Sequence, residues 1–188
     1  MPESRFTVQD TAITGIKVVT RTRMGDHRGF LSRLYCRDEL AEAGFASPIA
    51  QINQTLTCQR GAIRGMHYQY PPHAEDKFVT VLRGAVLDVA VDLRAGSPTL
   101  RCWHGEELTA DNNRSLFIPK GCAHGFQTLT ENCELLYLHT DFYAAASERA
   151  VSAFDPTIGI EWPLEPTDMS ARDRSHAFLP PDFTGIDL

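Results

Sequence analysis

Short stretches in which apolar and polar residues alternate recur along most of the chain. In AVLDVAVDL, residues 85–93, the apolar residues take one side of an extended strand and two aspartates take the other. Further strands are predicted for GIKVVTR (15–21), RGMHYQ (64–69), FVTVL (78–82), SLFIP (115–119) and CELLYLHT (133–140). Turn-forming residues, mainly Gly, Pro and Asn, separate these segments, so we expect an antiparallel sandwich or barrel.

One short helix is predicted between the strands. The segment ELAEA (39–43) has helix-forming residues, with Asp38 placed to cap its start and Gly44 placed to end it. The tail after Trp162 is rich in Pro, Asp and Arg, and we expect residues 164–188 to wrap over the surface. No linker or repeat interrupts the chain. We therefore expect residues 1–188 to form a single all-β domain with a few short peripheral helices.

Composition narrows the classes of function. The 188 residues are 43% hydrophobic and 22% charged, which is ordinary for a globular protein, and the net charge of -6 argues against a nucleic-acid partner. The sequence has no long apolar run and no leader-like segment, so we expect no membrane partner and a cytoplasmic location. The five cysteines are odd in number and form no C-x-x-C pair, which favours reduced thiols.

Two motifs carry candidate chemistry. His67 and Gln69 are two residues apart in a predicted strand, so their side chains point to the same side. Farther along, IPKGCAH (118–124) contains P-x-G-x-x-H and ends at His124. The pair of motifs is similar to the two-part cupin signature, which implies a jelly-roll barrel or sandwich.

The residue types at these motifs do not suit a metal ion. In metal-binding cupins the first motif supplies two histidines and a glutamate, and the second supplies another histidine. Here Gln69 stands in place of the second histidine, and Lys77 lies in the region of the glutamate. An amide is a weak ligand and an ammonium group repels a cation, so we expect no metal and no other cofactor.

The remaining side chains suit proton transfer next to a carbonyl. His67 is a candidate base, Lys77 a candidate stabiliser of an oxyanion, and Tyr137 a candidate acid. Each residue also has a structural interpretation: the histidine could pack inside the barrel, the lysine could be solvated, and the tyrosine could belong to the core. The spacing of the three residues in the sequence does not show whether they lie close together in the fold.

The chain resembles the dTDP-4-dehydrorhamnose 3,5-epimerases of deoxysugar biosynthesis. The resemblance spans about residues 20–175, and its combination of motifs is specific although each motif alone is weak. The matching segments are GDHRGF (25–30), QIN (51–53), IRGMHYQ (63–69), DVAVDLRAGSPT (88–99), FIPKGCAHGF (117–126), YLHTDFY (137–143), DPTIGIEWP (155–163) and SARD (170–173).

This resemblance implies a homodimer that acts without a cofactor on a nucleotide-diphospho-4-keto-6-deoxyhexose, with dTDP-4-keto-6-deoxyglucose as the leading substrate. His67 matches the general base and Asp173 the carboxylate that pairs with it. Lys77 matches the group that stabilises the enolate, and Tyr137 the acid that returns a proton on the opposite face. Substrate contacts are implied for Arg28, Gln51, Asn53, Arg64, Gln69, His124, Tyr143, Glu148 and Arg172.

One substrate-contact position departs from the family. Family members usually carry a glutamate five residues after the arginine of the RGF motif, where it accepts a hydrogen bond from thymine, and this chain has Arg33 there. A guanidinium only donates hydrogen bonds, so selectivity for thymine over cytosine could be weakened or reversed, unless Arg33 points into solvent.

Three further questions stay open from the sequence. Epimerisation could take place at C3, at C5 or at both carbons, and the sugar could be linked to dTDP, CDP or GDP. A non-catalytic barrel that binds sugar nucleotides is an alternative from another class. Surface or packing positions are expected for the other histidines, namely His27, His73, His104, His139 and His176.

Overall fold

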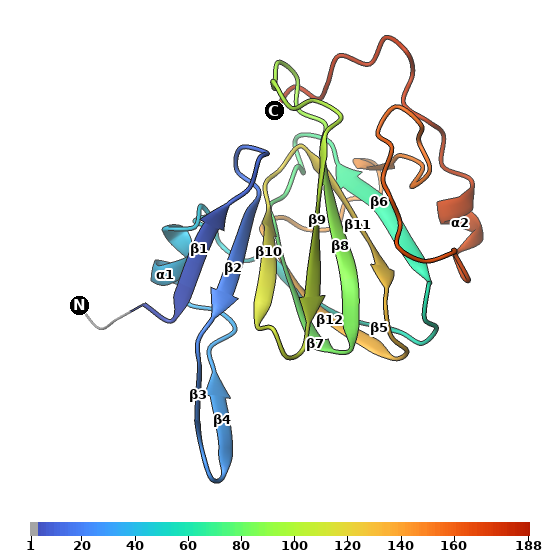
Figure 1. Ribbon diagram of the computed structural model, residues 1–188. Helices are drawn as coiled ribbons and strands as arrows, with labels where there is room; N and C mark the ends of the chain where they lie inside the picture. Colours follow the sequence, from blue (N-terminus) through green and yellow to red (C-terminus); the bar gives the residue numbers. More distant parts are fainter. Residues whose placement is uncertain (1–3) are drawn as a thin grey trace.

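The computed structural model describes residues 4–188, and its core is two β-sheets packed face to face (Figure 1). One sheet has six strands in the order β1 (Phe6–Asp10), β2 (Lys17–Arg21), β10 (Arg114–Ile118), β7 (Lys77–Arg83), β12 (Cys133–His139) and β5 (Gln51–Thr57). The other has five, in the order β13 (Glu148–Ala150), β6 (Ile63–Gln69), β11 (Cys122–Thr128), β8 (Ala85–Asp92) and β9 (Trp103–Thr109). A separate hairpin joins β3 (Arg23–Asp26) to β4 (Gly29–Ser32).

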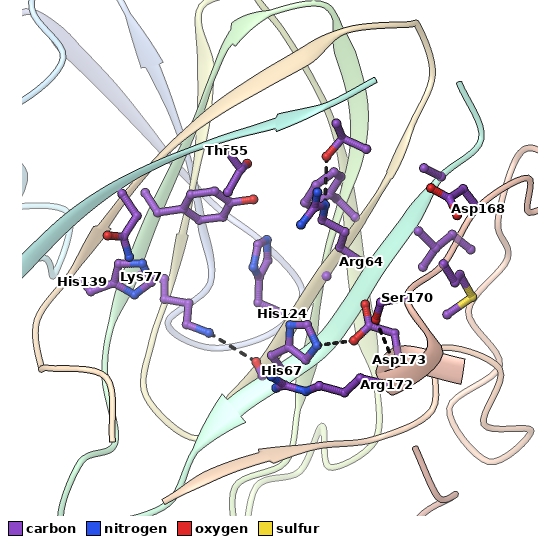
Figure 2. Close-up of a pocket in the computed structure, with 18 residues that line it drawn as sticks. Thr55, Arg64, His67, Lys77, His124, His139, Asp168, Ser170, Arg172 and Asp173 are labelled. Carbon is purple, nitrogen blue, oxygen red and sulfur yellow. Dashed lines mark hydrogen bonds and ion pairs between the residues drawn. The ribbon is translucent and has the colours of Figure 1, made fainter. Parts of the chain in front are cut away.

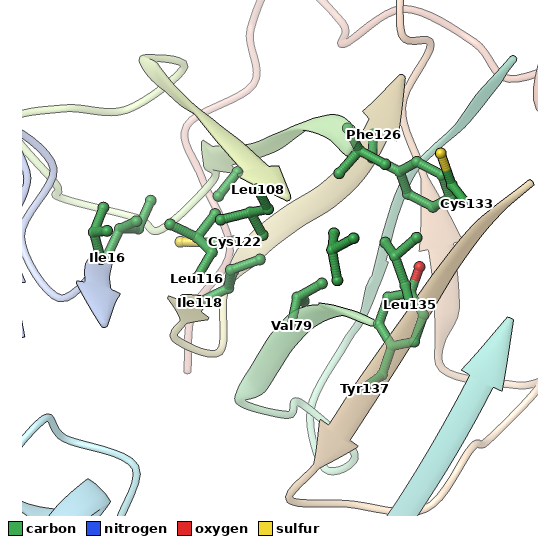
Figure 3. Close-up of a cluster of buried hydrophobic side chains, with 14 of the residues drawn as sticks. Ile16, Val79, Leu108, Leu116, Ile118, Cys122, Phe126, Cys133, Leu135 and Tyr137 are labelled. Carbon is green, nitrogen blue, oxygen red and sulfur yellow. The ribbon is translucent and has the colours of Figure 1, made fainter. Parts of the chain in front are cut away.

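The space between the two sheets holds the main apolar core (Figure 3). Val79, Leu116 and Leu135 enter it from the six-stranded sheet, and Leu108 and Phe126 enter it from the five-stranded sheet. All five side chains are almost fully buried. The predicted all-β class is confirmed, and the architecture is a sandwich, because the two sheets do not close into one barrel.

The outer face of the five-stranded sheet is covered by the C-terminal part of the chain. Val89 and Val91 of β8 pack there against Met169, Leu179 and Ile186, which all lie after residue 162. This second apolar cluster explains why β8 is buried on both faces, although its alternating sequence suggests one polar face. The tail therefore helps to hold β6 and β8 in place through this apolar packing.

A short helix, α1 (Arg37–Ala41), helps to cover the outer face of the six-stranded sheet, where Leu40 packs with Phe78. It begins earlier than predicted. The N-cap is Cys36, whose carbonyl accepts the first helical hydrogen bond from Leu40, and Asp38 lies inside the first turn. The prediction that Asp38 caps the helix was therefore wrong. A first-turn aspartate still favours the helix, because it faces the positive end of the helix dipole.

Two further predictions can be compared with the structure. All five cysteines are free thiols. Over residues 4–188, none of the helices is long and apolar enough to cross a membrane.

Asp92, at the end of β8, organises the turn that follows. Its carboxylate accepts hydrogen bonds from the guanidinium and backbone N–H of Arg94, and from the hydroxyls of Ser97 and Thr99 at 2.5 and 2.7 Å. Burial alone would raise the pKa of this carboxyl, but the hydrogen bonds outweigh burial and lower it to about 2. The ionised form of Asp92 is therefore more stable in the folded protein than in the unfolded chain.

We expect Asp92→Asn to lower the free energy of unfolding by about 2 kcal/mol at pH 7. Because the pKa is lowered on folding, this stabilisation is present above about pH 4 and is lost as the pH falls toward 2. Denaturant unfolding at pH 7 and pH 2.5 measures it, with the exposed Asp182→Asn as the control. A loss of equal size at both pH values would contradict this assignment.

Candidate active site

A cavity of about 630 Å³ opens between the two sheets (Figure 2). Its walls come from β5, β6, β7, β11 and β12, together with residues 168–173 of the tail. A smaller cavity of about 180 Å³ is lined partly by the same residues, Asn53, His67, Lys77 and His139. These shared residues make the two cavities parts of one site.

His67 lies on β6 and points into the cavity, while the next residue, Tyr68, packs on the opposite side of the sheet. Its Nε2 atom is 2.8 Å from Oδ1 of Asp173. That aspartate belongs to a second short helix, α2 (Ala171–Arg174), and its backbone N–H donates to the Ser170 hydroxyl at the N-cap. The tail thus delivers a fixed carboxylate to the histidine.

The environment keeps Asp173 ionised. Burial alone would raise its pKa, but the hydrogen bond with His67 and the charges nearby outweigh burial and hold this pKa below its ordinary value. An ionised carboxylate only accepts hydrogen bonds, so Nε2 of His67 carries the proton. In the neutral form of His67 the lone pair is then on Nδ1, which is the arrangement required of a general base.

Lys77 starts β7 and is 7% exposed. Its ammonium group donates to the backbone carbonyl of His67 at 3.3 Å and lies 3.5 Å from Glu75. Burial would raise the pKa of Glu75, but His139, whose Nδ1 is 2.9 Å from the carboxylate, and Lys77 together lower it. Glu75 is therefore a counter-ion that holds the lysine cation at the wall of the cavity.

Tyr137 lies on β12, in the sheet that faces His67, and lines the cavity from the main core. Its ring lies between two histidine rings, with centroid distances of 5.9 Å to His124 and 6.0 Å to His139. Burial raises the pKa of the phenol, which therefore keeps its proton at neutral pH and is suited to act as an acid. His124 is fixed in turn, with its Nε2 atom 2.8 Å from Oδ1 of the buried Asp88.

A set of charged and polar groups borders the smaller cavity. Glu148 accepts a hydrogen bond from the Tyr143 hydroxyl at 2.9 Å and forms an ion pair with Arg172. Gln69 donates both amide protons to backbone carbonyls, at 3.0 and 3.1 Å, in the loops that flank this cavity. Gln69 thus positions the loops, and its predicted contact with substrate stays a prediction.

Comparison with known proteins places this site in a family. The sequence profile of the dTDP-4-dehydrorhamnose 3,5-epimerases matches residues 10–180. The chain is 41% identical over 176 residues to the dTDP-4-dehydrorhamnose 3,5-epimerase of Pseudomonas aeruginosa, with 93% of each chain covered. This chain belongs to the dTDP-4-dehydrorhamnose 3,5-epimerase family. The resemblance seen in its motifs is therefore confirmed.

Relatives within the family differ in their named activity. The dTDP-4-dehydrorhamnose 3-epimerase of Streptomyces niveus is 38% identical over 168 residues, which covers 89% of this chain and 81% of that one. A solved relative is the dTDP-6-deoxy-D-glucose-3,5-epimerase of Legionella pneumophila in complex with dTDP-4-keto-L-rhamnose. It is 36% identical, superposes with a TM-score of 0.88, and 92% of each chain is covered.

In this member of the epimerase family, most of the residues predicted for the site lie close together. Every predicted catalytic or substrate-contact residue except Arg28 and Arg33 lines one of the two cavities. The catalytic set is completed by long-range contacts: Asp173 comes from the tail, 106 residues away from His67 in the sequence.

Arg28 and Arg33 lie elsewhere. Arg28 is at the tip of the β3–β4 hairpin, which extends away from the sandwich in Figure 1, and its guanidinium donates to Asp26. Arg33 follows the hairpin and forms an ion pair with Glu39 of α1. Neither side chain lines the two cavities of the site.

Sequence reasoning missed several residues of the site. His139, assigned above to the surface or to packing, lines both cavities and is bonded to Glu75. His176 was assigned in the same way, but it packs against His67 with ring centroids 5.7 Å apart. The Ser170-to-Asp173 spacing is a helix-start signal that could have predicted α2. No local pattern marks the two histidines.

Proposed function

We propose that this protein epimerises a nucleotide-diphospho-4-keto-6-deoxyhexose, with dTDP-4-keto-6-deoxyglucose as the leading substrate and dTDP-4-keto-rhamnose as the product. One observation carries the proposal: a histidine on one sheet, paired with a carboxylate from the tail, and a buried tyrosine on the other sheet line the same cavity. A base and an acid on opposite walls suit removal of a proton from one face of a carbon and its return on the other face.

In the proposed mechanism, Nδ1 of His67 takes the proton from the carbon next to the ketone. The electron pair moves to the ketone oxygen, and the ammonium group of Lys77 stabilises the resulting enolate. Asp173 stabilises the imidazolium that forms. The phenol of Tyr137 then gives its proton to the opposite face of the carbon, and both groups return to their starting states by exchange with solvent.

Proton NMR of the sugar nucleotide in deuterated water tests this function. We expect the enzyme to exchange the hydrogens at C3 and C5 for deuterium and to invert both centres. Binding of the nucleotide sugar without any exchange would contradict the proposal and would favour the non-catalytic sugar-binding barrel.

A second candidate is an epimerase that acts at C3 alone. The Streptomyces niveus relative bears that name, so the family includes this activity at similar identity. The same NMR experiment separates the candidates, because a C3 epimerase leaves the hydrogen at C5 unexchanged. The cytoplasmic location of the reaction stays a prediction from composition.

We propose further that Arg33 weakens the preference for thymine nucleotides. It occupies the position where the family usually has glutamate, and an arginine cannot accept the hydrogen bond that a thymine ring N–H offers. Because Arg33 forms an ion pair with Glu39 in this chain, the pair would have to open before the arginine contacts a nucleotide.

Calorimetric binding of dTDP and CDP tests Arg33. We expect Arg33→Glu to raise the ratio of dTDP to CDP affinity by at least about tenfold, since a site can reject a base that leaves its polar groups unpaired. The matched control is Arg37→Glu, an exposed arginine at the start of α1. A strong preference for dTDP in the parent that Arg33→Glu leaves unchanged would contradict the proposal.

We also propose that the protein works as a homodimer in which Arg28 serves the cavity of the partner subunit. The hairpin that carries it exposes two large apolar side chains, Phe30 and Leu31, at 61% and 65%. Strand β5, at the edge of its sheet, exposes Ile52 and Leu56 as well. A second copy would cover these surfaces and give Arg28 a diphosphate to bind.

Mixing two inactive variants tests this arrangement. In a mixed dimer of Arg28→Ala and His67→Ala chains, one cavity has an intact histidine and receives an intact arginine from the other chain. We therefore expect co-refolding of the two variants to restore activity. If each arginine served its own chain, every cavity would keep one defect and the mixture would stay inactive.

A further inference from the structure

The carboxylate of Asp173 is shared by two histidines. Its Oδ1 atom is 2.8 Å from Nε2 of His67 and 3.4 Å from Nε2 of His176, a residue that follows α2. The three ligand atoms all lie within 4.8 Å of one another. Among residues 4–188, this is the one group of three or more His, Cys, Asp or Glu side chains that meet in this way.

His176 has no evident role in the proton transfers described above. Its Nε2 atom is buried and has no hydrogen-bond partner, and its side chain is 15% exposed. Buried polar atoms in folded proteins nearly always have a partner, so an unpartnered imidazole nitrogen next to a carboxylate calls for an explanation. The ring stands almost perpendicular to that of His67, and the Nε2 atoms of both rings lie within 3.4 Å of the same carboxylate oxygen.

We propose that His67, Asp173 and His176 form a binding site for a divalent first-row metal ion such as Zn²⁺, and that the bound ion inhibits the enzyme. In a tetrahedral zinc site each ligand atom is about 2.0–2.2 Å from the ion, which puts neighbouring ligand atoms a little over 3 Å apart. The two imidazole nitrogens lie 2.8 and 3.4 Å from Oδ1 of Asp173, close to that spacing, and all three ligand atoms lie within 4.8 Å of one another.

The ligand types select the kind of ion. Two imidazoles and one carboxylate suit zinc and the neighbouring transition metals, whereas Mg²⁺ and Ca²⁺ prefer oxygen ligands alone. Arg172 is the nearby cation, but its guanidinium is engaged by Glu148, which reduces its repulsion of a second positive charge. Of the three ligands only His67 stands at a position of the cupin metal motif; Asp173 and His176 come from the tail, so the ligand set differs from that of a cupin metal.

Binding at this place would remove the base. The ion takes the place of the proton on Nε2 of His67, and that proton is released to solvent. The metal charge then withdraws electron density from the ring, so Nδ1 becomes a poor proton acceptor. This inhibitory effect rests on the proposed role of His67, whereas the binding of the ion does not.

Calorimetric titration of the full-length protein with Zn²⁺ tests the site. We expect one ion per chain, and we expect His176→Ala and His176→Gln each to weaken its binding by at least about tenfold. The control is His104→Ala, because His104 lies 3.5 Å from Glu106 but has no third ligand. Cobalt absorbance in the visible range reports the geometry of the bound ion.

Two results would overturn the site: no zinc binding by the parent, or equal binding by the parent and both His176 variants. The inhibition is tested separately. Deuterium exchange into the sugar nucleotide should fall as the site fills with Zn²⁺ and should return after a chelator is added. Full exchange at saturating Zn²⁺ would overturn the inhibition and leave the binding site intact.

Discussion

Replacing His67 with alanine is expected to slow deuterium exchange at both C3 and C5 of the substrate by about 10²–10⁴-fold, the usual contribution of a positioned base. The rates at the two carbons should fall together, because the proposed mechanism uses His67, paired with the ionised Asp173, as the base for both carbons. Proton NMR in deuterated water measures both rates in a single experiment. Loss at only one carbon would show that a second base serves the other.

His104→Ala is the matched control for this substitution. His104 also lies close to a carboxylate, that of Glu106, but it lines neither cavity. We expect the control to exchange deuterium at the parent rate. Unchanged exchange in His67→Ala would remove this histidine from the mechanism, and a loss in both variants would point to a general effect of removing an imidazole.

Replacing Tyr137 with phenylalanine is expected to separate exchange from inversion. His67 can still remove the proton, and solvent can return deuterium from the same side, so exchange should persist. Delivery of a proton on the opposite face should fall by about 10²–10⁴-fold, because the phenol that burial keeps protonated is gone. NMR of the recovered sugar measures exchange and configuration at each carbon.

The matched control is Tyr70→Phe. Tyr70 is partly buried in the outer cluster beneath the C-terminal tail, and it lines neither cavity. We expect that variant to keep the parent ratio of inversion to exchange. A Tyr137→Phe enzyme that loses both processes equally would show that the tyrosine positions the substrate instead of protonating it.

The sequence predicted the strands that have a clear pattern. Strand β8 was found because its apolar residues alternate, and β12 because CELLYLHT has an apolar run, LLYL, at its centre. Strand β11 was not predicted as a strand: its sequence, CAHGFQT, has a glycine and three polar residues within seven positions. Pairing with β6 and β8 on both sides holds it in the sheet, and such pairing between distant segments leaves no local signal.

The site likewise contains some residues that the sequence predicted and others that it did not. The residues inside family motifs were predicted, and most of them meet in the cavities. Glu75 and His139 were missed because their contact joins a loop to a strand 64 residues away. The four-residue helix α2 is too short to show a helical period, so Asp173 was assigned from the family motif, and the one local signal, the Ser170-to-Asp173 capping spacing, was not used.

The segment that covers β8 also supplies Asp173, and this links the order of synthesis to the onset of activity. A nascent chain that ends near residue 165 has its two sheets and His67, but it lacks the partner carboxylate of the base and the tail side chains that pack in the same cluster as Val89 and Val91. Folding of the tail onto the sheet therefore completes the apolar packing and the base at the same time. A single proteolytic cut between Trp162 and Ser170 that released the tail would reverse both.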